Sequence, residues 1–338
     1  MDTGKKNVAT LNDVAREAGV SKFTVSRVLN GRLASARVSE TTRQRILATV
    51  DTLRYRPNAV ARSLRRRRTG IVGAYFGFSS APMTTPFTAS TMQGFQNGCN
   101  ANRYDLLVHG TFRGGSVDDI YGELTDGKID GLLIFALADN PLLALLAASH
   151  LPVVAVGSVL PGIASVVVDD GEAGRLQAGH LAQAGHRHVL FIGSDRAQTS
   201  SERRQAAFFA EAARLGLQVR GEMAHTASGF DLPDAVVAQI ARRDAGRVTA
   251  VACWCDGVAQ SVVNHCLAHG IAVPQALAVV GCDGFWSNVT PARRLSTVGC
   301  FWEKVGERAV AVLHDLIGGA AVADETVMPV EWIAGDTT

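Results

Sequence analysis

The sequence lacks any uncharged apolar run of about 18 residues, which excludes a membrane-spanning helix. Its first eight residues are polar and lack the apolar stretch of a secretory signal, so we expect a cytoplasmic protein. Six cysteines in 338 residues do not make a disulfide scaffold, and we expect reduced thiols. Charged residues are also sparse, at 19%, whereas 47% of residues are hydrophobic. A large core is therefore available, and wholesale disorder is excluded.

Acidic residues are scarce at the N-terminal end. Residues 1–68 contain 16 lysines and arginines but 5 acidic residues, which gives a net charge of +11. The remaining residues carry a net charge of −9. A small basic head on a large acidic body indicates a polyanionic partner, and the chain length indicates two or three domains. The alternative, a solvated basic tail, is disfavoured because the head is patterned for folding.

The basic head carries the signals of three short helices. Thr10 and Asp13 fit a capping box at the start of the first helix, and Gly19 fits its end. Ser21 and Ser39 are suited to cap a second and a third helix, each followed by apolar residues at helical spacing. Two helices joined by about three residues, with a third closing the core, form a helix-turn-helix.

The second helix of a helix-turn-helix enters the major groove of DNA. Arg27 on its outward face is suited to pair bidentately with a guanine, and Lys22 to reach a guanine or a phosphate. Phe23 is suited to touch a thymine methyl group. The alternative for each is an exposed side chain in contact with solvent only.

Beyond Ile71, apolar strand-like runs alternate with helical stretches, which predicts parallel sheets with helices on both faces. Two such sets imply two doubly wound lobes facing a ligand cleft. The predicted strands are Ile71–Phe76, Asp105–His109, Leu132–Phe135, Val153–Val156, Val189–Ile192, Thr249–Cys253 and Leu277–Gly281. The predicted helices lie near Thr88–Asn100, Val117–Asp126, Leu142–Ser149, Glu172–Ala184, Ser201–Leu215, Pro233–Arg242 and Gly257–His269.

The head resembles the DNA-binding domain of the lactose-repressor (LacI/GalR) family over about 55 residues. The segments that carry the resemblance are Thr10–Ala15, Ala18–Ser21, Thr24–Gly31, Val38–Arg43 and Tyr55–Leu64. The resemblance implies an α plus α/β protein: a three-helix head, a hinge helix and a two-lobed periplasmic-binding-protein-like core. The implied limits are 1–56 for the head, 57–68 for the hinge, and 69–338 for an effector-binding and dimerisation domain. Within that domain we expect lobe 1 at about 69–168 and 299–331, and lobe 2 at about 169–298 and 332–338.

The hinge from Pro57 to Leu64 is too short for a helix that is stable alone, so we expect it to order on binding. The resemblance implies that Leu64 wedges into the minor groove; packing between subunits is the alternative. Arg65–Arg68 would neutralise phosphates unless they are a solvated linker. The expected DNA-binding residues are Thr10, Ser21, Lys22, Phe23, Thr24, Ser26, Arg27, Asn30, Asn58, Ala61 and Leu64.

The resemblance also implies an effector site in the cleft. Arg204 matches the family's ligand-binding arginine, and Asp283 matches a carboxylate that accepts bonds from ligand hydroxyls. Asp256 follows a strand end, and Phe87 is suited to stack on an apolar ligand face. The alternatives are surface ion pairs and a core aromatic residue. Ala207 and the segment Trp254–Asp256 depart from the family pattern, which bears on the class of ligand.

The hypothesis is therefore a repressor that binds a near-palindromic operator as a homodimer under the control of a sugar or sugar acid. The alternatives are a sugar-processing enzyme with a DNA-binding appendage and an architectural DNA-binding protein with a silent pocket. We expect no enzymatic activity, cofactor, metal or membrane partner. Gly122–Lys128 lacks the Ser or Thr of a phosphate loop, and His265 and His269 lack a third metal ligand. Because no leucine-heptad tail follows Trp332, we expect a dimer.

Overall fold

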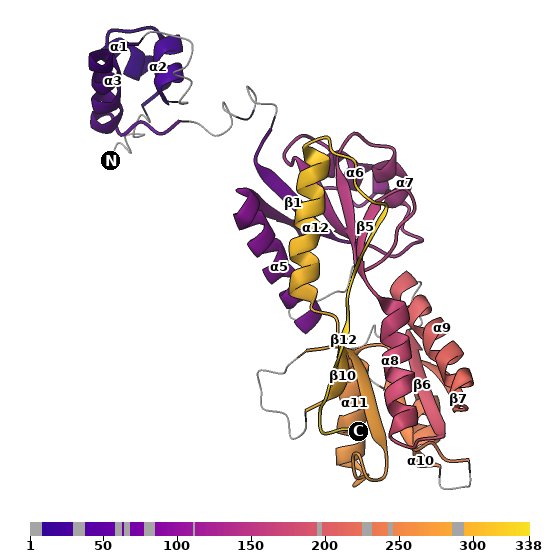
Figure 1. Ribbon diagram of the computed structural model, residues 1–338. Helices are drawn as coiled ribbons and strands as arrows, with labels where there is room; N and C mark the ends of the chain where they lie inside the picture. Colours follow the sequence, from indigo (N-terminus) through magenta and orange to yellow (C-terminus); the bar gives the residue numbers. More distant parts are fainter. Residues whose placement is uncertain are drawn as a thin grey trace, which may run out of the picture. The chain divides into compact units, whose positions relative to one another are not determined.

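The computed structural model consists of two compact units, Met1–Thr69 and Gly70–Thr338 (Figure 1). Each unit has its own hydrophobic core. The described residues are 9–29, 38–57, 63, 68–77, 85–110, 112–194, 198–224, 232–242, 246–285 and 294–338.

The described part of the first unit, the head, contains helices α1 (Leu11–Glu17), α2 (Lys22–Leu29) and α3 (Glu40–Thr52). The capping box of α1 is present: Asp13 N donates to Thr10 Oγ1 over 3.3 Å, and Thr10 N donates to Asp13 Oδ2 over 2.9 Å. Gly19 turns the chain with a φ of +61°, which glycine adopts without strain. The buried side chains are Val14, Ala15, Ala18, Val25, Val28, Ile46 and Tyr55. The predicted three-helix head is confirmed.

The second unit contains two sheets, which define lobe 1 and lobe 2. In lobe 1 the described strands are all parallel, in the order β11-β5-β4-β3-β1-β2. Helices α5 and α12 pack on one face of this sheet and α6 and α7 on the other. The strands are β1 (Ile71–Phe76), β2 (Asp105–His109), β3 (Gly131–Phe135), β4 (Val153–Val156), β5 (Ala164–Val168) and β11 (Glu325–Met328). The helices are α5 (Pro86–Asn102), α6 (Val117–Leu124), α7 (Leu142–Ala147) and α12 (Trp302–Ile317).

Lobe 2 has the strand order β12-β10-β9-β8-β6-β7, and β12 is antiparallel to β10. Helices α8 and α9 cover one face and α10 and α11 the other. The strands are β6 (His188–Ser194), β7 (Gln218–Ala224), β8 (Ala250–Cys253), β9 (Ala278–Asp283), β10 (Ser296–Gly299) and β12 (Glu331–Ile333). The helices are α8 (Asp170–Gln183), α9 (Thr199–Arg214), α10 (Asp234–Ala241) and α11 (Asp256–Ala268). The predicted doubly wound α/β class is confirmed.

The chain passes between the two lobes three times: between β5 and α8, between β10 and α12, and between β11 and β12. Gly299 lies in β10 and Glu331 in β12, so both belong to lobe 2 rather than to lobe 1, where the sequence-based limits placed them. Core packing continues across the crossings, because Cys282 and Val298 of lobe 2 belong to the same buried cluster as the lobe 1 strands.

Helix α12, which the sequence analysis did not predict, packs closely against α5. An ideal Cβ on Gly94 would lie 2.0 Å from the carbonyl oxygen of Glu303, and one on Gly306 would lie 2.7 Å from that of Thr91. Glycine at both positions therefore lets the two helix backbones approach each other. This contact fixes the first turn of α12, which begins at Trp302. Strands β5, β7, β10, β11 and β12 were likewise not predicted from the sequence.

Candidate functional site

Helix α2 presents the side chains that we expect to meet DNA. Ser21 caps the helix, since Thr24 N donates to Ser21 Oγ over 3.1 Å. Val25 and Val28 point into the head core, which leaves the opposite face of α2 outside the core. The predicted DNA contacts that the structure leaves exposed or half-buried are Thr10, Ser21, Lys22, Phe23, Thr24, Ser26 and Arg27.

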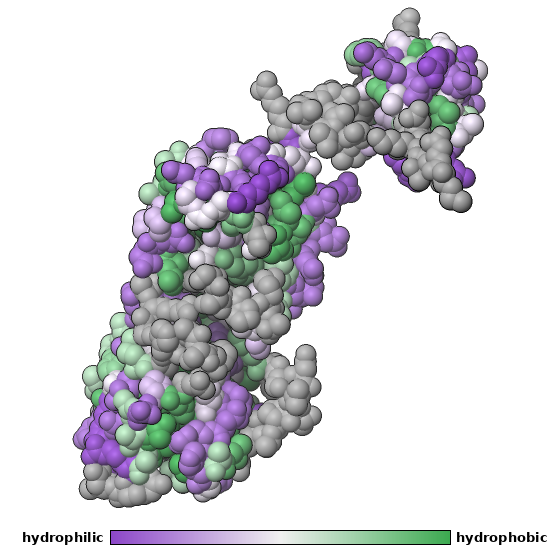
Figure 2. Space-filling model, turned by 180° about the vertical axis from the view of Figure 1, so that it is seen from behind, coloured by the Kyte–Doolittle hydropathy of each residue, from purple (hydrophilic) through white to green (hydrophobic). Residues whose placement is uncertain are grey.

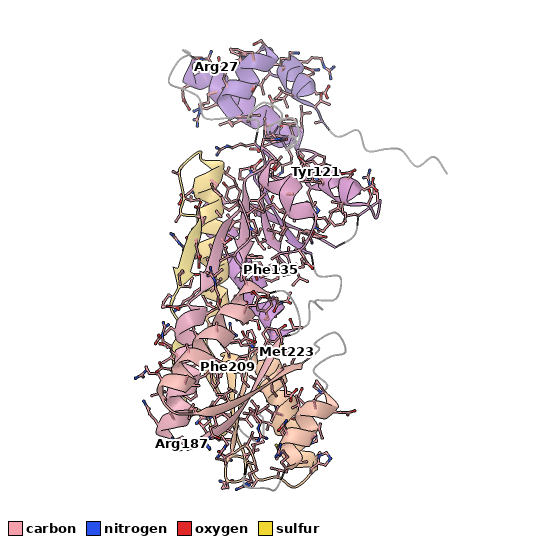
Figure 3. The ribbon with its side chains drawn as sticks, turned by 90° about the vertical axis from the view of Figure 1, so that its right-hand side faces the viewer. Arg27, Tyr121, Phe135, Arg187, Phe209 and Met223 are labelled. Atoms are coloured by element: carbon pink, nitrogen blue, oxygen red, sulfur yellow. The ribbon has the colours of Figure 1, made fainter. Side chains whose placement is uncertain are left out.

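Phe23 and Arg27 form a pair on this outward face. The side chain of Phe23 is 66% exposed. The guanidinium carbon of Arg27 lies 5.1 Å from the centroid of its ring, a cation–π contact between residues one helical turn apart. Hydrophilic residues make up most of the described surface of the head in Figure 2, and Figure 3 labels Arg27 on it.

Four of the expected DNA-binding residues lie outside the described residues: Asn30, Asn58, Ala61 and Leu64. The same holds for residues 65–67 of the arginine run. Their roles in DNA binding stay predictions.

In lobe 2, Asp256 holds the turn that positions Asp283. Asp256 begins α11, and its Oδ2 accepts hydrogen bonds from Gly284 N over 2.9 Å and from Phe285 N over 2.8 Å. Its Oδ1 accepts from the Thr297 hydroxyl over 2.5 Å. Asp256 N in turn donates to Asp283 Oδ2 over 3.4 Å. The two carboxylates therefore meet where β8 and β9 end, at the carboxyl edge of the sheet.

The proximity of Asp256 and Asp283 disfavours two negative charges. Burial raises the pKa of Asp256 to about 6, against the hydrogen bonds that it accepts. Burial, together with the neighbouring Asp256, raises the pKa of Asp283 to about 8. Ionisation of both carboxyl groups at once is therefore disfavoured.

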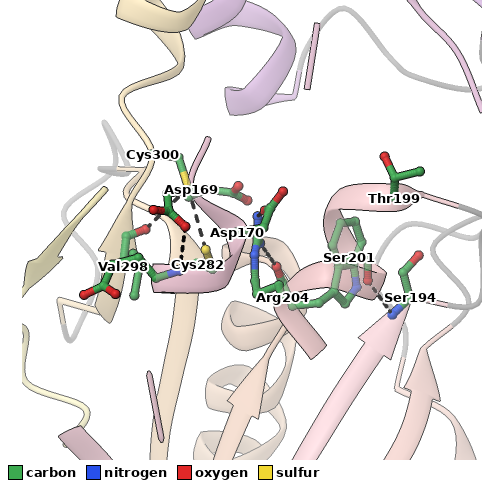
Figure 4. A network of polar contacts seen from close by, with 12 residues as sticks. Asp169, Asp170, Ser194, Thr199, Ser201, Arg204, Cys282, Val298 and Cys300 are labelled. Atoms are coloured by element: carbon green, nitrogen blue, oxygen red, sulfur yellow. Dashed lines mark hydrogen bonds and ion pairs between the residues drawn. The ribbon is translucent and has the colours of Figure 1, made fainter. Parts of the chain in front are cut away.

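Arg204 lies beside Asp256 and Asp283, but its guanidinium group already forms a buried ion pair with Asp170 (Figure 4). Its Nη2 donates to Asp170 Oδ1 over 2.7 Å, and the two side chains are 3% and 2% exposed. Its Nη1 donates to the carbonyl oxygen of Trp254. The buried Nε of Arg204 and Oδ2 of Asp170 have no hydrogen-bond partner among the described residues. Arg204 thus joins α9 to the start of α8 and to the end of β8.

Aromatic side chains cover the facing edge of lobe 1. Phe76 stacks on Phe135 with ring centroids 4.8 Å apart, and Phe87 meets Phe135 edge-on at 5.5 Å. Phe87 also meets Trp302 edge-on at 4.7 Å. Trp302 Nε1 donates to Asp283 Oδ1 over 3.1 Å, which links this cluster to lobe 2. Phe135 lies at the end of lobe 1 that faces lobe 2 (Figure 3).

Two further contacts join the lobes. Val159 N of lobe 1 donates to Thr199 Oγ1 at the start of α9 over 3.0 Å. Arg203 on α9 forms a two-pronged ion pair with Glu325 on β11, with nitrogen–oxygen distances of 2.5 and 3.2 Å. Both contacts lie on the α9 side, so this helix meets lobe 1 at two points.

The structure brings Arg204, Asp256 and Asp283 together on lobe 2 and connects them to Phe87 through Trp302. Sequence reasoning missed Trp302, which occurs in a helix that it did not predict. It also missed Asp170, the partner of Arg204. Phe135 is the last residue of the predicted strand Leu132–Phe135, and this position could have marked it as part of the lobe edge.

The six cysteines are free and buried: Cys99, Cys253, Cys255, Cys266, Cys282 and Cys300. The sulfur atoms of Cys282 and Cys300 lie 3.7 Å apart. Among the described residues, no three potential ligands are grouped to hold a metal ion. No helix in the described part of the chain has the length and apolar character needed to cross a bilayer.

Two family models match the chain. The model for bacterial regulatory proteins of the lacI family matches residues 10–58. The model for the periplasmic binding protein-like domain matches residues 178–338. The fold and these matches together define a helix-turn-helix head joined to a periplasmic-binding-protein-like core.

Curated relatives span almost the whole chain. The transcriptional repressor PurR of Photobacterium profundum is 30% identical over 319 residues, which cover 92% of each chain. The probable transcriptional repressor ExuR of Bacillus subtilis is 26% identical and covers 95% of each chain. The chain therefore belongs to the lacI family of bacterial regulatory proteins.

Solved structures share the fold. A lac repressor dimer bound to operator and the anti-inducer ONPF has a TM-score of 0.81 and 24% identity, covering 97% of this chain and 98% of the repressor. The regulator CelR in complex with cellobiose has a TM-score of 0.70 and 24% identity, covering 98% of this chain and 100% of CelR.

Proposed function

We propose that the chain is a transcriptional repressor that binds a near-palindromic operator as a homodimer and responds to a sugar or sugar acid. The observation that carries the DNA-binding part is the outward face of α2, where Phe23 and Arg27 lie opposite the buried Val25 and Val28. A helix capped by Ser21 and backed by a three-helix core presents these groups rigidly to the major groove.

The ligand part of the proposal rests on the chemistry of the facing lobe edges. The carboxyl groups of Asp256 and Asp283 are suited to exchange hydrogen bonds with hydroxyl groups. The aromatic edge with Phe87 and Phe135 is suited to cover the apolar face of a sugar ring. Because Arg204 is already paired with Asp170, the described groups favour a neutral sugar over a sugar acid.

Control of DNA binding follows from the position of this site. A ligand held between Asp283 and the lobe 1 aromatic cluster contacts both lobes, so it stabilises one interlobe arrangement over others. If the operator affinity of the dimer differs between these arrangements, ligand and operator binding are coupled reciprocally. We propose the hinge, residues 57–68, as the connection that transmits this coupling.

The experiment uses the full chain and two single variants. An operator is first selected from random DNA duplexes, and its affinity is measured by fluorescence anisotropy with and without each member of a neutral and acidic sugar panel, cellobiose included. Arg27→Ala should lose specific operator binding and keep the thermal shift caused by the active sugar. Asp283→Asn should keep operator binding and lose the response to the sugar.

Arg214→Ala is the matched control, because it removes one positive charge from an exposed site on the two-lobed unit. It should leave both activities unchanged. Loss of operator and sugar binding together in either test variant would contradict this separation of roles, and turnover of the bound sugar would favour an enzyme.

A further inference from the structure

A small cavity lies where the chain passes between the two lobes. Its volume is about 150 Å³. One wall comes from residues 300–301, which connect β10 to α12, and the other from residues 329–330, which connect β11 to β12 (Figure 1). The described residues that line it do not include Asp256, Asp283 or the aromatic residues of the lobe 1 edge. The cavity is therefore distinct from the site proposed for the sugar.

The floor of the cavity is uncharged and largely apolar. Cys300 is buried, and Met328 and Val330 are half-buried. A hydrogen bond with Cys282 and burial both raise the pKa of the Cys300 thiol, so this group stays neutral. A cavity of this volume accommodates a group about the size of a benzene molecule. The floor thus suits a short apolar side chain.

Phe301 forms a wall whose direction is set by the backbone. Its φ of +49° lies in the left-handed region, which a bulky residue rarely adopts. Residues held in such conformations cluster at ligand-binding and other functional sites. The Nζ atom of Lys304 lies 5.1 Å from the centroid of the Phe301 ring, which makes a cation–π contact. This contact holds the ammonium group of Lys304 beside the wall.

Two exposed side chains of opposite charge complete the lining, Lys304 and Glu331. Among the described residues, neither forms an ion pair with the other or with a third residue. A small molecule that carries a carboxylate and an ammonium group would satisfy both charges at once. Together with the apolar floor, these charges define the chemistry of an amino acid with an apolar side chain.

We propose that this cavity binds a free amino acid with a short apolar side chain. Its carboxylate accepts a hydrogen bond from Lys304, its ammonium group donates to Glu331, and its side chain lies on the apolar floor. Neither the sugar response nor DNA binding is required for this site. Because both walls are segments that pass between the lobes, an occupied cavity favours one arrangement of the lobes over others.

The test is a calorimetric titration of the full chain with L-leucine, whose isobutyl side chain matches the floor. Two leucine analogues each lack one charge: 4-methylpentanoate has no ammonium group, and 3-methylbutylamine has no carboxylate. Leucine should bind, and each analogue should bind about tenfold more weakly, which corresponds to the loss of one charge-assisted hydrogen bond. Added leucine should also slow amide hydrogen exchange in residues 299–305 and 327–331.

Two substitutions assign each ligand charge to its partner. Glu331→Gln should abolish the preference for leucine over 4-methylpentanoate and keep the preference for leucine over 3-methylbutylamine. Lys304→Gln should keep the first preference and abolish the second. Because both side chains are exposed, both variants should unfold at about the same urea concentration as the native chain.

Arg308→Gln and Asp324→Asn are the matched controls, because each removes one charge from an exposed side chain that does not line the cavity. Both controls should keep the two preferences of the native chain. A titration in which leucine gives no heat of binding would overturn the proposal. Unchanged preferences in Glu331→Gln and Lys304→Gln would overturn it as well, since leucine would then bind elsewhere on the chain.

Discussion

The indole Nε1 of Trp302 donates a hydrogen bond to Asp283 Oδ1 over 3.1 Å, joining the first turn of α12 in lobe 1 to the end of β9 in lobe 2. Trp302 is nearly buried, and the carboxyl group that it meets is also linked to the backbone of Asp256. A change in the separation of the lobes must therefore alter the surroundings of the carboxyl pair.

Trp302→Phe keeps an aromatic ring against Phe87 but removes the donor to Asp283. We expect the free energy of unfolding to fall by about 1–3 kcal/mol, because a buried acceptor loses its partner. Urea unfolding would measure this. Trp332→Phe makes the same chemical change at a half-buried tryptophan of lobe 2. It should lower the free energy of unfolding less than Trp302→Phe does. Equal losses in the two variants would show that the Trp302 hydrogen bond contributes nothing measurable.

Arg204→Ala should destabilise the chain by about 3–5 kcal/mol, since it leaves the carboxylate of Asp170 buried without its cation. The double variant Asp170→Ala with Arg204→Ala should be less destabilised than the sum of the single variants, because no charge is then left unpaired. Chemical denaturation of the three variants checks this. Strict additivity would mean that the two side chains do not interact energetically.

The free energy of unfolding should fall as pH rises from about 4 to about 8, because the carboxyl groups of Asp256 and Asp283 lose their protons over this range. The pKa of Asp283 is raised from 3.8 to about 8 and that of Asp256 from 3.8 to about 6. Between about pH 4 and about pH 8 the folded chain therefore retains protons that the unfolded chain has released, and the stabilisation from these protons is lost as pH increases.

Urea unfolding of the native chain and of Asp283→Asn from about pH 5 to about pH 8.5 tests this dependence, because the asparagine cannot ionise. The native chain should lose stability relative to the variant over this range. If the free energy of unfolding changed with pH in the same way in the native chain and in Asp283→Asn, Asp283 would not titrate between about pH 5 and about pH 8.5.

The contact between α5 and α12 leaves no room for a side chain at Gly94, where a Cβ would lie 2.0 Å from a backbone oxygen. Gly94→Ala should destabilise the chain by about 1–3 kcal/mol through overpacking. Gly122→Ala on α6 is the control, because a Cβ there meets nothing within 4 Å. It should be neutral or stabilising by up to about 1 kcal/mol. Thermal unfolding distinguishes the two, and equal melting temperatures would contradict the close approach.

The head was predictable because its signals are local. The Thr10–Asp13 capping box and the turn at Gly19 depend on residues within one or two helical turns of each other. The outward position of Phe23 and Arg27 follows from the helical spacing of Val25 and Val28. What the spacing did not reveal is that the Arg27 guanidinium lies against the Phe23 ring, since both side chains have several rotamers.

The residues of the proposed effector site were predictable only in part. Asp256 and Asp283 follow strand ends, so parallel-sheet topology predicts that they share one edge. Trp302 was missed because α12 was not predicted. Its apolar positions Val305, Ala309 and Val312 have helical spacing, and that spacing was the available signal. The partner of Arg204 was beyond sequence reasoning, because Asp170 lies 34 residues away on another helix.

The order of amino acids by itself determined the basic head, its three capped helices, the alternation of strands and helices, and the family resemblance. These features depend on short-range patterns of polarity, capping and turn residues. The tertiary structure alone decided that Arg204 is paired with Asp170, that Asp256 and Asp283 are buried next to each other with raised pKa values, and that Trp302 joins the lobes. Such relationships depend on distances between chain segments far apart in sequence, and those distances exist only after the sheets have packed.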